Sequence, residues 1–165
     1  MNLKEKINSD IKEALKEKQD LAILTLRMLQ AAILNKEKDK RAKLAKEKKE
    51  IREEELVKES QLTDEETIEA ISSEIKKRKE SVLEFEKGER IDLVEKEKKE
   101  IGILEKYLPE QLSEEEIQKL VKEALEKTGA ASPKDMGKVM AELIPKVKGK
   151  ADGSLVSRIV KESLS

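Results

Sequence analysis

The chain has 165 residues, 44% of them charged, yet its 36 Lys and Arg and 37 Asp and Glu nearly cancel to a net charge of −1. The absence of Cys excludes thiol nucleophiles, disulfides and iron–sulfur clusters, and the absence of His removes the commonest metal ligand and the usual general base. One Phe, one Tyr and no Trp leave little material for β-strands, whereas the abundant Glu, Lys, Leu and Ala favour helices. We therefore expect an all-α protein.

The first 34 residues predict two helices. Residues 2–18 place Ile7, Ile11 and Ala14 on one apolar stripe of an otherwise charged segment. In residues 21–34 only Thr25, Arg27 and Gln30 are polar, so this segment is apolar around most of its circumference. Such a helix is normally buried among several neighbours, and we expect it at the centre of an N-terminal bundle.

A strongly charged stretch follows. Residues 36–52 carry nine Lys or Arg against four acids, and residues 53–74 carry nine acids against one Lys. Neither Gly nor Pro interrupts residues 35–60, which therefore predict a long, solvated helix supported by Glu–Lys pairs. The order of basic then acidic residues also suits a binding surface, and this alternative stays open.

The next segment predicts a helical hairpin. Thr63 and Glu66 have the spacing of a capping box, and apolar residues then recur every three or four positions, as in a seam along another helix. Arg78 occupies one seam position, so it must reach solvent, pair with an acid or face a ligand. We expect Gly88 to end this helix in a left-handed conformation and residues 91–107 to form the next one.

A domain boundary is expected at Leu108-Pro109, because proline disfavours helix at the preceding residue. Three short helices are predicted beyond it, namely 114–127, one that starts after Ser132 and stops near Pro145, and one from about 153 to Leu164. The predicted architecture is all-α, with an N-terminal helical bundle or hairpin that includes a long charged helix (1–108) and a small three-helix C-terminal domain (109–165).

The sequence offers no catalytic constellation. Nucleotide-binding glycine motifs and Gly-x-Ser-x-Gly elbows are absent, and carboxylate pairs are too common here to indicate acid–base chemistry. We therefore assign no catalytic residue, no metal ligand and no cofactor. The longest apolar run, 21–34, is shorter than the roughly 20 residues that span a bilayer, and no signal peptide is visible, so we expect a cytoplasmic protein without a membrane partner.

The most specific signal is a basic segment, 132–161, with seven basic residues against three acidic ones. Lys146, Lys148 and Lys150 alternate with apolar or small residues in a predicted turn that leads into a helix N-terminus, where free N–H groups and aligned dipoles suit a phosphate. A solvated turn that keeps a small domain soluble is the alternative. The candidate nucleic-acid contacts are Lys138, Lys146, Lys148, Lys150, Arg158, Lys161, Gly137, Gly149 and Gly153.

Four sequence strings resemble the YqeY family: TLRML (25–29), EKYLPEQLSEEE (105–116), KDMGKVM (134–140) and PKVKGKADGSLVSRIVKE (145–162). Members of this family are free-standing helical proteins similar to the tail of the GatB component of the aspartyl/glutamyl-tRNA amidotransferase. In that enzyme the related tail contacts the body of tRNA, while kinase and amidase chemistry occur elsewhere. A similar module is appended to some glutaminyl-tRNA synthetases.

The resemblance implies a non-catalytic, tRNA-binding accessory module that contacts the phosphate backbone with little base readout, since only Phe85 and Tyr107 are aromatic. A second hypothesis is a protein-interaction module that docks on an amidotransferase or an aminoacyl-tRNA synthetase. The resemblance also suggests a carbon–nitrogen ligase with glutamine as amido donor, but neither an amidase Ser-Ser-Lys arrangement nor an ATP site is present.

Overall fold

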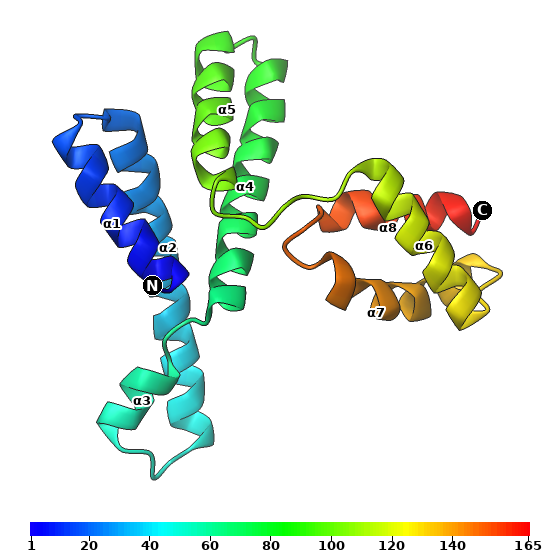
Figure 1. The fold of residues 1–165 in the computed structure, drawn as a ribbon, viewed down its shortest axis with the longest axis horizontal. Helices are drawn as coiled ribbons and strands as arrows, with labels where there is room; N and C mark the ends of the chain where they lie inside the picture. Colours follow the sequence, from blue (N-terminus) through cyan, green and yellow to red (C-terminus); the bar gives the residue numbers. More distant parts are fainter. The chain divides into compact units, whose positions relative to one another are not determined.

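The computed structural model describes residues 1–165, which form eight α-helices, one short 3-10 helix and no strand (Figure 1). The chain divides into two compact units, Met1–Tyr107 and Leu108–Ser165, one residue away from the expected boundary. The all-α fold class predicted from composition is confirmed.

The N-terminal unit contains five helices: α1 (Leu3–Lys16), α2 (Asp20–Glu47), α3 (Glu53–Glu59), α4 (Asp64–Lys87) and α5 (Ile91–Glu105). Helices α4 and α5 lie side by side as a hairpin, and α2 packs against α1, α3, α4 and α5 (Figure 1). The core is aliphatic, and its most deeply buried large side chains are Ile7, Leu29, Ile33, Ile71 and Leu104.

The segment 21–34 is less enclosed than its composition predicts. One face of α2 is buried, through Leu26, Leu29 and Ile33, but Leu24 is 46% exposed and Met28 is 48% exposed. The expected central position of this helix agrees with its contacts to α1, α3, α4 and α5, but part of its apolar surface stays exposed. Four neighbouring helices exist, yet they contact only part of the circumference of α2.

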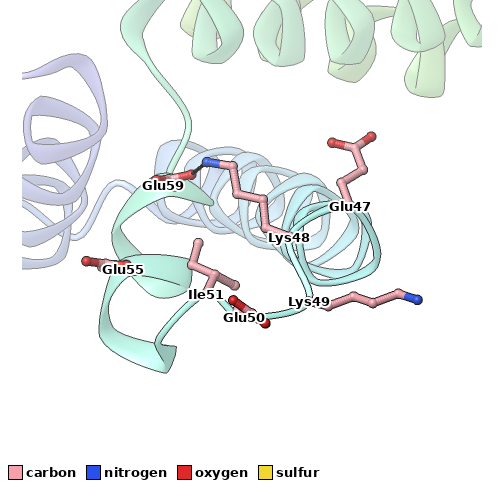
Figure 2. A pocket seen from close by; sticks show the side chains of 7 residues that line it. All are labelled: Glu47, Lys48, Lys49, Glu50, Ile51, Glu55 and Glu59. Carbon is pink, nitrogen blue, oxygen red and sulfur yellow. Dashed lines mark hydrogen bonds and ion pairs between the residues drawn. The ribbon is translucent and has the colours of Figure 1, made fainter.

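The predicted uninterrupted charged helix over 35–60 is also wrong. Helix α2 ends at Glu47, the chain turns back, and α3 packs against α2. Figure 2 shows Ile51 between the two arms of this turn, with the Lys48 ammonium reaching Glu59 at 2.6 Å. Local propensity favours a continuous helix, but in the observed turn Ile51 is half-buried, and burial of its apolar side chain favours the reversal.

Ion pairs and hydrogen bonds within the chain neutralise some of the charges in the basic segment 36–52 and the acidic segment 53–74. The Lys40 ammonium lies 2.7 Å from the Glu66 carboxylate, and the buried Glu37 accepts hydrogen bonds from Lys4 and from the Leu62 N–H at 2.6 and 3.1 Å. These interactions help to hold α1, α2 and the start of α4 together.

The cap at the start of α4 agrees with the one predicted from the sequence, whereas the cap at its end does not. Thr63 and Glu66 form the predicted capping box. Gly88, however, has φ −85°, and the left-handed residue is Glu89, with φ 55°. Ile91, the first residue of α5, is 70% exposed.

The C-terminal unit consists of α6 (Glu114–Thr128), the 3-10 helix η1 (Pro133–Asp135), α7 (Met136–Val147) and α8 (Gly153–Ser163). Helix α7 contains Pro145 and continues to Val147, beyond the predicted stop. The core of the unit consists of Ile117, Val121, Ala124, Val139, Leu143, Val147, Val156, Ile159, Val160 and Leu164.

Candidate nucleic-acid interface

The basic turn of the C-terminal unit, Lys148–Asp152, joins α7 to α8, and its backbone is held in place by the segment before α6. Gly149 takes φ +73°, a left-handed conformation that glycine adopts without strain. The Leu112 N–H donates to the Lys150 carbonyl at 2.7 Å, and the Gln111 side-chain amide donates to the Gly149 carbonyl at 2.8 Å. These two bonds fix the turn while the side chains of Lys148 and Lys150 stay exposed.

The structure brings together only part of the predicted set. Lys146, Lys148, Gly149, Lys150 and Gly153 lie at this end of the unit, within or beside the turn. The remaining candidates lie along the helices that lead away from it (Figure 1).

Gly137 and Lys138 belong to the first turn of α7, which places Lys138 about 12 Å from Lys146 along the helix. Arg158 and Lys161 lie roughly 8 and 12 Å beyond the start of α8. A single phosphate cannot contact all of these cations, whereas an extended backbone can.

Acidic neighbours partly neutralise several candidates. The Lys146 ammonium lies 3.7 Å from Glu142, and Lys127 binds the same carboxylate at 2.6 Å. The hydrogen bond from Lys127 is the main reason that the pKa of Glu142 lies below its ordinary value, so this carboxylate stays charged at neutral pH.

Arg158 and Lys138 also have carboxylates nearby. Arg158 lies 3.8 Å from Glu114 and 3.9 Å from Glu162, and Lys138 lies 4.0 Å from Asp135. The N–H groups of Ala131 and Ser132 bind Asp135 and lower its pKa. A phosphate at Arg158 or Lys138 must therefore compete with a carboxylate, whereas Lys150 and Lys161 make no ion pair.

The start of α8 is capped by an acid. Asp152 Oδ1 accepts a hydrogen bond from the Ser154 N–H at 2.8 Å, so a carboxylate already occupies the favourable position at the positive end of this helix. This helix N-terminus is therefore a weaker phosphate site than the sequence predicts, and the exposed lysine side chains are the stronger candidates at this turn.

Two features of the C-terminal unit escaped the sequence interpretation. The anchoring of the turn by Gln111 and Leu112 joins residues almost forty positions apart, and no local pattern reveals such a contact. The acids that neutralise Arg158 could be anticipated only in part. Glu162 lies one helical turn from it, whereas Glu114 is on another helix.

The N-terminal unit contains a buried charge cluster at Arg78. Arg78 Nε donates to Glu100 at 2.9 Å and Nη1 donates to Glu74 at 3.0 Å, which decides among the three alternatives for Arg78 in favour of pairing with acids. Burial raises the pKa of Glu74, but hydrogen bonds from Lys77 and Arg78 outweigh this effect and hold it below its ordinary value. No group of Asp or Glu in the structure has a geometry that could hold a metal ion.

Comparison with known proteins gives two informative relatives. The chain is 32% identical over 160 residues to "Altered inheritance of mitochondria protein 41, mitochondrial" of Pyrenophora tritici-repentis, covering 95% of this chain and 78% of that protein. It is 43% identical over 51 residues to an uncharacterized protein of Schizosaccharomyces pombe, covering 31% of this chain and 42% of that protein. The name of the first relative describes that protein as mitochondrial. The cytoplasmic location expected for this chain stays a prediction. None of the helices is both long and apolar enough to cross a membrane.

The family model described as "Yqey-like protein" matches residues 47–164, which begin at the last residue of α2 and include the whole C-terminal unit except Ser165. The resemblance drawn from the four sequence strings is thereby confirmed: the chain belongs to the Yqey-like protein family.

Proposed function

We propose that this protein is a non-catalytic accessory module that binds tRNA through the phosphate backbone, with the α7–α8 turn of the C-terminal unit as the central contact. The observation that carries the proposal is the group of exposed lysines at 146, 148 and 150 on a turn whose backbone is fixed by Gln111 and Leu112. A fixed turn presents its cations at low entropic cost, because the backbone does not have to be ordered on binding. Lys138, Arg158 and Lys161 extend the basic surface along α7 and α8 in both directions from the turn.

Contacts to the phosphate backbone of tRNA predict that the binding affinity depends strongly on salt, since each neutralised phosphate releases condensed counterions. Contacts from about three lysines predict that the logarithm of the association constant falls with the logarithm of salt concentration with a slope near −2 to −3. We expect little preference among tRNA species, because the basic surface has no aromatic side chain on which bases could stack.

The test is fluorescence anisotropy of labelled bulk tRNA, titrated with the full chain over a range of salt concentrations beside a duplex DNA of similar length. The double variant Lys148→Glu, Lys150→Glu should lower affinity for tRNA at least tenfold and flatten the salt dependence. The matched control is Lys119→Glu, Lys122→Glu, which reverses two exposed lysines on α6 and changes the net charge equally. Equal losses in both variants would mean that only net charge matters and would reject the turn as the contact.

The non-catalytic part of the proposal has its own assay. Purified protein incubated with glutamine, ATP and tRNA should release no ammonia above background. Ammonia release that a single Ser or Asp substitution abolishes would overturn this part and leave the binding result standing.

A further inference from the structure

The turn between α2 and α3, residues 48–52, has a sequence that favours helix. It contains neither Gly nor Pro, and the α3 helix that follows is seven residues long and has no buried residue. A short helix that starts anew must order its first turn, a cost that a continued helix avoids. Ile51 is half-buried in the turn, but the Lys48–Glu59 ion pair is exposed at both ends and contributes little to stability (Figure 2). A single helix through α2 and α3 therefore competes with the hairpin.

The hairpin cannot open within one chain without losing the contacts that follow it. In the closed form the Lys40 ammonium donates to the Gln61 carbonyl at 3.0 Å, and the Leu62 N–H donates to Glu37 at 3.1 Å. In a continuous helix Lys40 and Gln61 would lie about 30 Å apart. The buried Glu37 would lose this donor, and the apolar face of α2 that packs against α4 would meet water. An opened chain therefore needs another α4 in the place of its own.

The same contacts can form between two copies of the chain. Three hydrogen bonds join the second half of α2 to the residues just after α3, and the two members of each pair are nearly equidistant from Glu50. The pairs are Arg41 with Ser60, Lys40 with Gln61 and Glu37 with Leu62. Two continuous helices that run antiparallel, with a two-fold axis near Glu50, therefore place each of these residues beside its usual partner on the other copy.

The order of charges along this segment suits an antiparallel pairing. Residues 36–52 carry nine basic and four acidic residues, and residues 53–74 carry nine acids and one Lys. An antiparallel pair of helices places the basic half of each copy beside the acidic half of the other, whereas a parallel pair places like charges together. The charges therefore favour a second copy of this chain in the antiparallel orientation.

We propose that residues 48–52 are a hinge at which the α2–α3 hairpin opens into one helix, so that two copies exchange α4, α5 and the residues after them in a domain-swapped dimer. The partner is a second copy because it carries an α4 that fits the face of α2 left uncovered. Such a dimer needs no new interface, since the exchanged contacts are those of the monomer. The exchange is independent of the tRNA-binding proposal and uses no residue of the basic turn.

The first experiment refolds equal amounts of unlabelled and ¹⁵N-labelled full chain together from urea and separates monomer from dimer by gel filtration with light scattering. Carbodiimide then joins the Lys40 ammonium to the Glu66 carboxylate, which lie 2.7 Å apart. Mass spectrometry should find about half of these cross-linked peptides with mixed isotopes in the dimer and none in the monomer, because exchange places the two residues on different copies. The internal control is the Lys87–Glu84 pair at 2.8 Å within α4, which should never be mixed.

A hinge variant tests the opening itself. Glu53→Pro places proline at the first position of α3, and Arg52 before it has φ −71° and ψ 147°, a conformation that suits a residue preceding proline. In a continuous helix the same proline lies in the interior, so the variant should keep the monomer and lower the dimer fraction at least tenfold. The control Glu53→Ala removes the same charge but favours helix, and it should leave the dimer fraction equal or higher.

Three results would overturn the proposal. A chain that stays monomeric after refolding at every protein concentration makes no exchange. A dimer whose Lys40–Glu66 peptides never mix isotopes is held by the surfaces of intact monomers. A dimer that persists in Glu53→Pro does not need an open hinge. The isotope result is obtained on the unmodified chain and stands whether or not the proline variant folds.

Discussion

The buried ion pair between Arg78 and Glu100 shows how two residues constrain the packing of two helices. Arg78 and Glu100 are both at most 5% exposed and lie on different helices of the α4–α5 hairpin. An ion pair of this kind adds little net stability over well-packed apolar side chains, but removing one partner leaves an uncompensated charge and costs about 3–5 kcal/mol. The pair therefore penalises any other register between α4 and α5.

Tyr107 is the only tyrosine and lies in the N-terminal unit, where its hydroxyl donates to Asp10 at 2.5 Å. Burial, the hydrogen bond to Asp10 and the charge of Asp10 all raise the pKa of Tyr107 above its ordinary value of 10. A group with a raised folded-state pKa stabilises the fold fully below its unfolded pKa and loses this contribution as the pH rises. The N-terminal unit should thus lose stability above pH 10.

Absorbance at 295 nm measures this ionisation directly, since no other tyrosine contributes. We expect the folded protein to titrate well above pH 10, and Asp10→Asn to bring the midpoint down towards 10 because the neighbouring negative charge is gone. Glu13→Gln, on the same helix but without a bond to Tyr107, is the control. A tyrosine that titrates at its ordinary pKa in folded protein would contradict the observed burial.

At the scale of elements, helix starts follow local chemistry more closely than helix ends. The capping box predicted at Thr63 forms, and Ser113 forms another with Glu116, because the interacting groups are only three residues apart. Helix α7 instead continues past Pro145, and α2 stops where neither Gly nor Pro is present. Packing against another helix decides these two ends.

Alanine substitutions at two glycines of the basic surface should have opposite effects on the stability of the C-terminal unit. Gly149→Ala should destabilise the C-terminal unit by about 1–2 kcal/mol, since φ +73° is unfavourable for any residue with a Cβ. Gly137→Ala should stabilise it by about 0.5–1 kcal/mol, because a Cβ there meets no atom within 4 Å and alanine is a better helix former. If Gly137 contacts phosphate closely, the same change weakens tRNA binding.

Urea titration followed by the Met136 and Met140 methyl signals measures the stability, and anisotropy measures tRNA affinity in parallel. A Gly137→Ala variant that is more stable and binds tRNA unchanged would remove this glycine from the interface and leave the lysines of the turn in place.

At the scale of the whole molecule, the two units have different core sizes. The C-terminal unit is little more than half as long as the N-terminal unit, and smaller units bury a smaller share of their surface. Its stability should therefore be the lower of the two. Tyr107 reports on one unit, and Met136 and Met140 report on the other.

In a urea titration of the full chain, we expect the native methyl signals of Met136 and Met140 to disappear at a lower concentration than the change in Tyr107 fluorescence. Saturating tRNA should move the first transition upward and leave the second in place, because ligand binding stabilises only the unit that binds. Coincident transitions with and without tRNA would show that the units unfold as one.

The sequence by itself determined the helical fold class, the helix starts marked by capping boxes and the family, because these depend on composition or on residues a few positions apart. It also identified the basic segment, but not which of its lysines lie together. Only the tertiary structure decided the turn after Glu47, the exposure of Leu24 and Met28, the burial of Arg78 between two glutamates and the anchoring of the basic turn by Gln111. Each of these depends on contacts between residues that are distant in sequence, where burial and charge pairing outweigh local preference.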